Sequence, residues 1–428
     1  MIIAKHYPKD FSKQIKNSHS YINNRFDELY DGIKAGIIKF IKTQKESVIK
    51  KEMPKILKVM ADIYPLDRVR NCINEAELYL QLRKPSVCIY DHALHFIGGG
   101  QKYGCTIAEG IQNDYSTTLI ANKEIKLKTL EKWYDLKLNK CGLKIVKLPI
   151  NKKDDFINPT LAEHSTKNPF AKVEDEVLNH DIFINVNMVP HVNPIALKSA
   201  FLCHFPDGKR GNFFYVDKYD KVITNSKYTT KWLENKWGLK ADKIIYPPVD
   251  MKYKKRIKKE NIILSVSRFE ETGSKKQHEI VKTFIKMYKH YPKVMNDWKL
   301  VLAGGATEKN KYLKKIKQYV QSRNVPIEIF ANLSNNELKK LYARSKIFWH
   351  ACGLNQNINK NPNLIEHFGM TTVEAMQNGC APIVINAGGQ KEIVNHKFNG
   401  LRFNNEKQLQ KQTLKLIKRS KETHIKFT

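Results

Sequence analysis

The sequence predicts an α/β protein made of two doubly wound, Rossmann-like units and a helical N-terminal extension. Its 428 residues are too many for one ordinary domain. From residue 85 onward, apolar runs of strand length alternate with amphipathic helical stretches, the pattern of a parallel sheet covered by helices. The alternation starts again after Pro247 and Pro248, so we expect a first unit at 85–247 and a second at 248–428.

Residues 1–84 are expected to form the helical extension. A stripe of apolar residues with helical spacing runs through it, consisting of Phe26, Leu29, Ile33, Ile37, Phe40 and Ile41. Further helices are expected near 55–63 and 67–82, punctuated by Pro54, Pro65 and Pro85. The segment carries no chemical motif. It indicates an accessory bundle, with an element that docks on a membrane surface or a protein partner as the alternative.

Strands are expected at regular intervals in both units. In the first unit they are SVCIYD, STTLIAN, GLKIVKLP, DIFINVN, SAFLCHFP and KVITNS. In the second unit they are NIILSVSRF, WKLVLAGG, PIEIFAN, KIFWHA and APIVIN, and Ser334 is the expected N-cap of a helix. The last helix is a candidate to cross back to the first unit. Two such units in series place a ligand crevice outside the carboxyl ends of both sheets.

The positive charge is concentrated in the second unit. The net charge of the chain is +33, and residues 248–428 hold 35 basic and 14 acidic residues. This excess raises the local concentration of anionic ligands, which could be nucleic acid, a phosphorylated substrate or an acidic membrane. A nucleic-acid-binding protein would need clustered arginines and exposed aromatics. The chain has 11 arginines against 64 lysines and no such motif, so this class is the weaker alternative.

Composition also bears on cellular location and on metals. No apolar run approaches the roughly 20 residues of a membrane span, and the N-terminus lacks the apolar core of a signal peptide, so we expect a cytoplasmic protein. The seven cysteines are scattered without a CxxC pair, which indicates free thiols rather than disulfides or a zinc site. No Asp-x-Asp occurs, so the carboxylate pair that commonly holds Mg²⁺ or Mn²⁺ in transferases is missing.

The most specific motif is the stretch NLIEHFGMTTVEAMQNGCAPIVINAGG. Seven residues separate Glu366 from Glu374, and Gly369 allows a turn between them. Residues 371–374 have the form of a capping box that opens a short helix ended by Gly379. The backbone N–H groups of Gly369, Met370 and Thr371 would then form a phosphate site at a positive helix end. Alternatively, Glu374 is only the cap and Glu366 only a solvated loop acid.

A second motif, ILSVSRFEETGSKKQHEIVKTF, supplies cations. Arg268 ends a strand, and Lys275 and Lys276 precede the next helix. A diphosphate that departs needs about two positive charges, and arginine offers a bidentate fork where lysine offers a point charge. Counting back from the helix favours Lys275 over Lys276. The alternative is that the lysine pair only decorates the surface of a lysine-rich chain.

Taken together, residues 86–405 resemble the retaining glycosyltransferases of the GT-B fold, family 4 of the glycosyltransferase classification. The resemblance rests on the Glu–seven–Glu motif with Phe368 and Gly369 inside it, the following EAM…G helix and the strand ending in Gly-Gly. It implies that Glu366 contacts the hydroxyls of the donor sugar and that Glu374 holds the ribose of the nucleotide. The wording IEHFGM is similar to mannosyltransferases that extend lipid-linked oligosaccharides.

The same resemblance implies roles for other residues. Arg268 and Lys275 would hold the pyrophosphate, with Lys276 as the other candidate. His204, which follows the strand SAFLC, would lie against the donor sugar. The run Gly98, Gly99 and Gly100 after the first strand would form the loop next to the acceptor and the donor phosphates, although three glycines can also simply make a tight turn.

The implied activity is transfer of a hexosyl unit from a UDP- or GDP-linked sugar to a hydroxyl of a glycan, lipid-linked or protein acceptor, with retention of configuration. The implied route is front-face departure and attack, and we expect neither a cofactor nor a catalytic metal. We expect no nucleic acid partner, and residues 1–84 could bring the protein to the inner face of a membrane as a peripheral protein. A sugar-nucleotide-binding subunit without turnover is a further alternative. It is disfavoured because both glutamates and the basic pair are retained.

Overall fold

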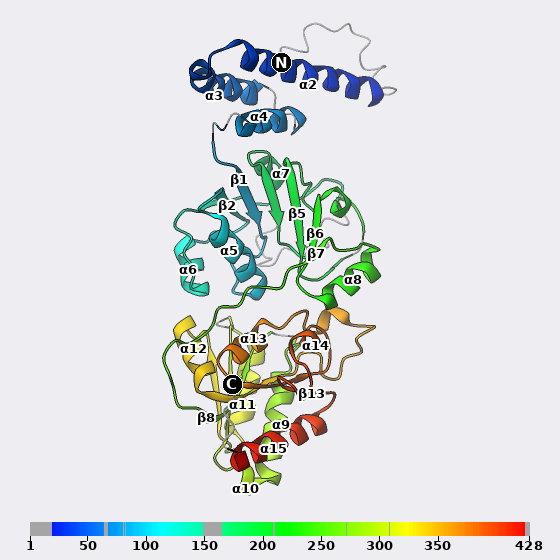
Figure 1. Ribbon diagram of the computed structural model, residues 1–428. Helices are drawn as coiled ribbons and strands as arrows, with labels where there is room; N and C mark the ends of the chain where they lie inside the picture. The colour runs from blue at the N-terminus through cyan, green and yellow to red at the C-terminus, as the bar shows by residue number, and fades with distance from the viewer. Residues whose placement is uncertain are drawn as a thin grey trace.

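The computed structural model describes residues 19–63, 67–79, 81, 83–148, 165–208, 210–270, 272–307 and 309–423. Three parts follow one another along the long axis of the molecule (Figure 1): the helices α2 to α4, a first sheet with its helices, and a second sheet with its helices. None of the helices in the described ranges is long and apolar enough to cross a membrane.

Three helices form the N-terminal part, namely α2 (His19–Thr43), α3 (Glu46–Ile63) and α4 (Asp67–Tyr79). They enclose a small core of their own, which includes Met53 and Leu57. Our expectation that Pro54 separates two helices is wrong, because Pro54 lies inside α3. A proline inside a helix costs about 3 kcal/mol, and full burial of Met53 and Leu57 beside it offsets this cost.

Arg83 attaches this part to the first sheet. Its guanidinium makes a bidentate pair with Asp181, at 2.5 and 2.7 Å. The side chain of Asp181 is 2% exposed, so the pair is an anchor rather than a surface contact.

The first sheet has seven parallel strands in the order β3-β2-β1-β4-β5-β6-β7. They are β1 (Ser86–Tyr90), β2 (Ser116–Ala121), β3 (Gly142–Ile145), β4 (Ile182–Asn185), β5 (Lys198–Cys203), β6 (Lys221–Thr224) and β7 (Lys243–Ile244). Its helices are α5 (Gly99–Ile111), α6 (Leu127–Tyr134), α7 (Ala171–Val177) and α8 (Lys227–Trp237). Two hydrophobic clusters, one containing Phe183 and Phe201 and the other Ile89 and Leu119, form its core.

The second sheet has six parallel strands in the order β10-β9-β8-β11-β12-β13. They are β8 (Glu260–Val266), β9 (Lys299–Gly304), β10 (Ile327–Ala331), β11 (Ser345–His350), β12 (Ala381–Ile385) and β13 (Leu401–Phe403). The helices are α9 (Gln277–His290), α10 (Pro292–Met295), α11 (Lys311–Gln321), α12 (Asn335–Arg344), α13 (Met370–Gln377), α14 (Gln390–Ile393) and α15 (Glu406–Thr423). The capping role of Ser334 is confirmed, since it forms a capping box with Glu337 at the start of α12.

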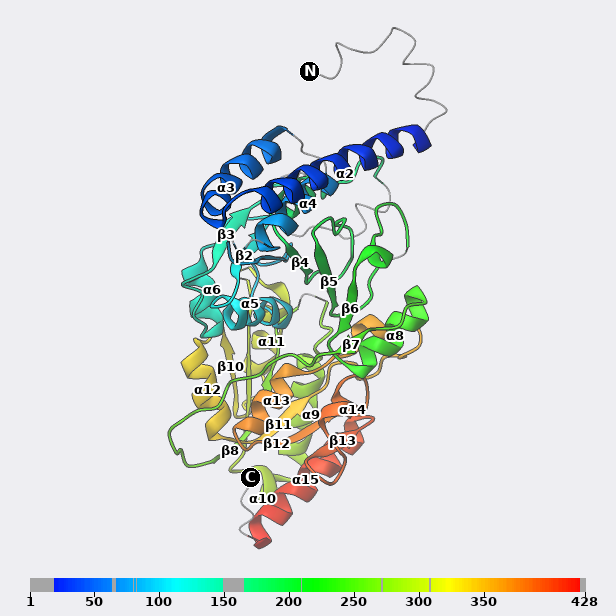
Figure 2. The same ribbon diagram turned by 45° about the horizontal axis from the view of Figure 1, so that its top comes forward.

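The last helix, α15, packs against α9, β12 and β13 of the second sheet. Figure 2 shows it at the end of the molecule farthest from α2 to α4. All seven cysteines are free thiols, as expected, and all but Cys141 are buried.

The strand orders confirm an α/β fold of two doubly wound sheets. All strands are parallel, and the order in which the chain adds strands to the sheet reverses between β1 and β4 in the first sheet and between β8 and β11 in the second. Ligands of such sheets bind outside the carboxyl ends of the strands at these switch points. The loops after β1, β8 and β11 carry Gly98–Gly100, Arg268 and Glu366, so the topology brings the two sequence motifs together.

Candidate functional site

Arg268 stands on a tightly held turn after β8. Gln277, which is 2% exposed, donates to the backbone carbonyl of Arg268 at 2.8 Å and to the hydroxyl of Ser267 at 2.9 Å. A Cβ at Gly304 would lie 1.9 Å from the carbonyl oxygen of Ser267, so only glycine allows this approach of the neighbouring strand. The guanidinium itself extends outward, 53% exposed, and pairs with Glu270 at 2.9 Å. The backbone is therefore fixed while the charge is accessible.

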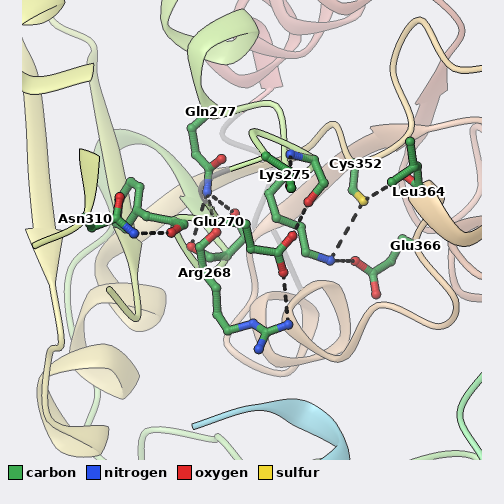
Figure 3. A network of polar contacts seen from close by, with 12 residues as sticks. Arg268, Glu270, Lys275, Gln277, Asn310, Cys352, Leu364 and Glu366 are labelled. Atoms are coloured by element: carbon green, nitrogen blue, oxygen red, sulfur yellow. Dashed lines mark hydrogen bonds and ion pairs between the residues drawn. The ribbon is translucent and has the colours of Figure 1, made fainter. Parts of the chain in front are cut away.

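Lys275 and Glu366 form the centre of the site. Nζ of Lys275 lies 3.1 Å from Oε2 of Glu366, and the same oxygen lies 3.2 Å from Nε2 of His350, a buried residue at the end of β11. Figure 3 shows the carboxylate of Glu270 between the guanidinium of Arg268 and the ammonium of Lys275. Within the part of the chain that the structure describes, both side-chain contacts of Glu366 are to Oε2, so Oε1 can accept a hydroxyl from a ligand.

The charges of this pair stabilise each other. Burial would raise the pKa of Glu366, but the positive charge of Lys275 and the hydrogen bond from His350 outweigh it and hold this pKa well below its usual value. Burial would likewise lower the pKa of Lys275, but the anionic groups around it, including Glu366 and Glu270, raise it instead. Burial raises the pKa of the neighbouring Cys352 thiol to about 12, so this thiol is protonated at neutral pH. The site therefore holds an ionised Glu366 beside a charged Lys275.

Lys276 is directed elsewhere. It is the N-cap of α9 in a left-handed conformation, with φ of 60°, and its ammonium lies 4.0 Å from Glu279 in the first turn of that helix. The geometry thus brings Lys275, and not Lys276, to Glu366.

Glu374 lies inside α13 rather than at its start. The expected capping box at 371–374 is wrong: the helix begins at Met370 after Gly369, which has φ of 115° and makes no side-chain cap. Because the left-handed glycine turns the chain so early, Glu374 falls in the second turn. The residue is buried, and its carboxylate accepts a hydrogen bond from the hydroxyl of Tyr342 at 2.9 Å. The end of the helix is as expected, since Gly379 follows it with φ of 70°.

Lys102, from α5 of the first unit, completes the surroundings of Glu374. Its ammonium lies 3.3 Å from Oε1 of Glu374, and both side chains are largely buried, at 12% and 8% exposed. This ion pair crosses between the two sheets, which places Glu374 at their interface.

The N-termini of α5 and α13 face each other. A Cβ at Gly99 would lie 2.9 Å from the sulfur of Met370, and Gly98 is an N-cap without a side-chain hydrogen bond. Thr371 lies in the first turn of α13, and Phe368 precedes it, largely buried against Tyr246 with ring centroids 5.4 Å apart. Two helix ends with unpaired N–H groups make this point attractive to an anion.

His204 borders the same space from the first unit. A Cβ at Gly100 would lie 3.2 Å from its Nε2, and this buried nitrogen has no hydrogen-bond partner among the described residues. Burial lowers the pKa of His204 to about 4, although a hydrogen bond that the ring donates to the backbone carbonyl of Val186 raises it. The ring is therefore neutral at pH 7. An unpaired buried nitrogen beside a helix N-terminus is suited to hydrogen-bond a ligand hydroxyl.

Four residues of the site escaped the sequence analysis, namely Lys102, Glu270, Tyr342 and His350. Glu270 stands two residues after Arg268 and Lys102 two after Gly100, so proximity to the motifs was an available signal for these two. Tyr342 and His350 lie in a helix and a strand, where burial is their ordinary explanation.

The comparisons with known proteins agree with this geometry. Residues 249–426 match the sequence model of the family described as Glycosyl transferases group 1. The chain is 27% identical over 242 residues to the GDP-Man:Man(3)GlcNAc(2)-PP-Dol alpha-1,2-mannosyltransferase of Dictyostelium discoideum. This match covers 52% of the chain and 44% of the relative, so the chain spans less than half of that relative's length.

Solved structures show the same fold. Anabaena Alr3699/HepE in complex with UDP and glucose has a TM-score of 0.56 at 14% identity, over 79% of this chain and 90% of that one. WaaG, a glycosyltransferase involved in lipopolysaccharide biosynthesis, has a TM-score of 0.54 at 12% identity, over 78% and 91%. The resemblance to group 1 glycosyltransferases and the GT-B fold is confirmed, and the matched family and the named relative support a glycosyltransferase.

Proposed function

We propose that this chain transfers a hexosyl unit from a nucleoside-diphosphate sugar with retention of configuration. Its residues 249–426 match the glycosyl transferases group 1, and its two sheets have the GT-B arrangement. The observation that carries the proposal is the pair of Lys275 and Glu366, 3.1 Å apart, beside Arg268 and the N-termini of α5 and α13. A sugar diphosphate needs such a combination, an acceptor for sugar hydroxyls next to fixed positive charge for the leaving group.

The leaving diphosphate is stabilised by Arg268, Lys275 and the backbone N–H groups at the two helix ends. Positive groups that are already in position lower the energy of a charge that develops during the reaction, and cost no reorganisation. The guanidinium of Arg268 is 53% exposed and pairs with Glu270, so a diphosphate would compete with Glu270 for it. We propose that these groups suffice and that no metal ion takes part.

The configuration is retained without a covalent intermediate. Oε2 of Glu366 is held by Lys275 at 3.1 Å and by His350 at 3.2 Å, so we assign this carboxylate to binding rather than to attack on the anomeric carbon. It accepts hydroxyls of the donor sugar instead, and His204 does so from the other unit. The acceptor then attacks from the face that the diphosphate leaves. Glu374, fixed by Tyr342 and Lys102, accepts the ribose hydroxyls.

For the donor and acceptor, the named relative suggests GDP-mannose and a lipid-linked glycan. A direct assay would incubate the purified protein with GDP-mannose, UDP-glucose and other nucleotide sugars, with and without isoprenoid-diphosphate-linked glycans. The proposal expects release of nucleoside diphosphate that rises with one acceptor, and a product with the anomeric configuration of the donor. Absence of turnover with every pair, from protein that binds nucleotide, would support the binding subunit without turnover.

We further propose that α3 holds the protein at an acidic lipid surface, on the cytoplasmic side. Val48, Ile56 and Val59 of α3 are 38%, 38% and 57% exposed, although they are apolar. Lys51 is also exposed. It lies three residues after Val48, on the same face of the helix. An apolar stripe beside lysines has the charge and shape to enter the headgroup region of an anionic bilayer.

A further inference from the structure

The N-terminus of α8, in the first unit, is capped by a carboxylate of the second unit. Oε2 of Glu392 accepts the backbone N–H of Lys227 at 2.9 Å, and Oε1 accepts that of Tyr228 at 2.8 Å. The hydroxyl of Tyr246 donates to the same carboxylate at 3.2 Å. An anion at a helix N-terminus satisfies unpaired N–H groups and faces the positive end of the helix dipole, so this contact holds the two units together.

Two side chains at the start of α8 also hold the loop that carries Glu366. The hydroxyl of Ser226 donates to the backbone carbonyl of His367 at 2.7 Å, and that of Tyr228 donates to the carbonyl of Pro362 at 3.0 Å. These two carbonyls lie on either side of Glu366 in the chain. The loop is therefore fixed from the opposite unit at both ends.

The ring of His367 adds an apolar contact at the same place. It stacks on Phe205, which follows β5 of the first unit, with centroids 4.1 Å apart and planes inclined by 10°. Burial lowers the pKa of His367 to about 4, although the charge of Glu366 raises it. The neutral ring therefore packs as an aromatic surface.

Within the second unit, the glycine pair after β12 joins Glu392 to the same loop. The N–H of Gly389 donates to the carbonyl of Glu366 at 2.9 Å. A Cβ at Gly388 would lie 2.2 Å from that oxygen, and a Cβ at Gly389 would lie 2.4 Å from the carbonyl oxygen of His367. Backbones this close move as one body. A shift of Glu392 away from α8 is therefore passed on to Glu366.

We propose that Ser226, Tyr228 and Glu392 form an interdomain clasp that positions Glu366 for sugar transfer. This inference rests on the proposed function, in which Glu366 is the group that contacts the sugar. The three are positioning residues, because none of them touches the expected donor and each acts through the backbone around Glu366.

The clasp has a specific kinetic consequence. Arg268 and Glu374, assigned to the nucleotide, are hydrogen-bonded to none of the three clasp residues. A misplacement of about 1 Å at a reacting group lowers the rate by as much as 100-fold. Loosening the clasp should therefore lower kcat and leave the affinity for nucleoside diphosphate unchanged.

The test compares Glu392→Ala, Glu392→Gln and Tyr228→Phe with the matched control Lys339→Ala. Lys339 also pairs across the units, with Asp135 at 2.6 Å, but does not contact the Glu366 loop. We expect kcat to fall about tenfold in Glu392→Ala and less in Glu392→Gln, whose amide oxygen still accepts one N–H. Tyr228→Phe should also lower kcat, and the control should keep it. The dissociation constant for GDP or UDP should stay within about twofold in all four.

Hydrogen exchange provides a second measurement that does not need turnover. Amides of residues 363–372 should exchange faster in Glu392→Ala than in the wild-type protein, and not in Lys339→Ala. Unchanged kcat and unchanged exchange in Glu392→Ala, or equal losses in the control, would overturn the clasp. If the wild-type protein transfers no sugar, while exchange is still faster in Glu392→Ala and not in Lys339→Ala, the proposed function alone is contradicted. The two failures are therefore distinguishable.

Discussion

Lys275 and Glu366 lie 3.1 Å apart although 91 residues separate them in the chain. Lys275 stands on the loop after β8 and Glu366 on the loop after β11. The strand order of the second sheet reverses between these two parallel strands. The ion pair therefore couples the group expected at the diphosphate to the group expected at the sugar. Loss of the Lys275 charge should therefore disturb both subsites.

Replacing Lys275 by Ala should lower turnover at least tenfold, which corresponds to about 1.4 kcal/mol of activation free energy. The variant loses a charge on the leaving diphosphate and frees Glu366 from its ion pair. Arg268→Ala should lower turnover as much, and Lys276→Ala is the matched control, because Lys276 pairs with Glu279. Steady-state kinetics on the folded variants measures this. Equal turnover in Arg268→Ala and wild type would refute the assignment of the diphosphate site.

The pH dependence of stability tests the electrostatics of the same pair. The lowered pKa keeps Glu366 ionised in the folded wild-type protein between pH 5 and 7, and the unfolded chain is ionised there too. Glu366 therefore adds no pH dependence to the free energy of unfolding in this range. Its stabilising contribution is lost only as the pH falls through the pKa of the folded state. In Lys275→Met, the positive charge that opposes the effect of burial on Glu366 is gone, so we expect the pKa of Glu366 to rise. A raised carboxyl pKa makes the folded state gain stability on acidification.

The difference in melting temperature between wild type and Lys275→Met should therefore narrow from pH 7 to pH 5. Thermal unfolding followed by circular dichroism measures it. A difference that stays constant or widens would show that Lys275 does not govern the charge of Glu366.

Much of the fold followed from sequence because periodicity and turn residues are local. The strand at 345–350 and the cap at Ser334 are examples. The first is a short apolar run that is buried on both faces, and the second is a serine with a glutamate three residues later. The misplaced capping box of Glu374 shows the limit. Gly369 has a left-handed conformation and lies against Gln390, where a Cβ would be 2.3 Å from the side-chain nitrogen, and no local pattern contains a contact 21 residues away.

Pairs between the two units were the least predictable part of the site. The contacts of Lys102 with Glu374 and of Ser226 with His367 join residues 272 and 141 positions apart. A single sequence does not indicate contacts between residues so far apart in the chain, since each residue alone has an ordinary structural explanation. The resemblance to a family pointed to the two glutamates and the basic pair. The structure shows the side chains that hold the glutamates in place.

Removal of divalent metal tests how the diphosphate is neutralised. If Arg268, Lys275 and the two helix ends are sufficient, turnover in excess EDTA should equal that with Mg²⁺ or Mn²⁺. The assay needs metal-free protein, with the metal content checked by mass spectrometry. Loss of turnover in EDTA that returns on adding one metal would show that a cation shares the site.

The exposed apolar face of α3 predicts binding to lipid. Val48, Ile56 and Val59 changed together to Ser should weaken binding to vesicles of phosphatidylcholine with anionic phosphatidylglycerol, and leave the melting temperature nearly unchanged because these side chains are exposed. Co-sedimentation at low and high salt measures it. The control changes Ile245 and Phe398, exposed apolar residues outside α3, to Ser. Equal binding of wild type and the triple variant would exclude this face.

The two glutamates should separate nucleotide binding from transfer. Glu374 is held by Tyr342 and Lys102 at the interface, and in Glu374→Gln a charge-assisted bond to the ribose, worth about 1.5–3 kcal/mol, would be weakened. The affinity for free nucleoside diphosphate should then fall roughly tenfold or more. Glu366 contacts Lys275 and His350 and is assigned to the sugar, so Glu366→Gln should keep diphosphate affinity and lose transfer. Calorimetric titration of both variants with the diphosphate and with the intact donor distinguishes them. Loss of diphosphate binding in Glu366→Gln, with binding kept in Glu374→Gln, would reverse the two roles.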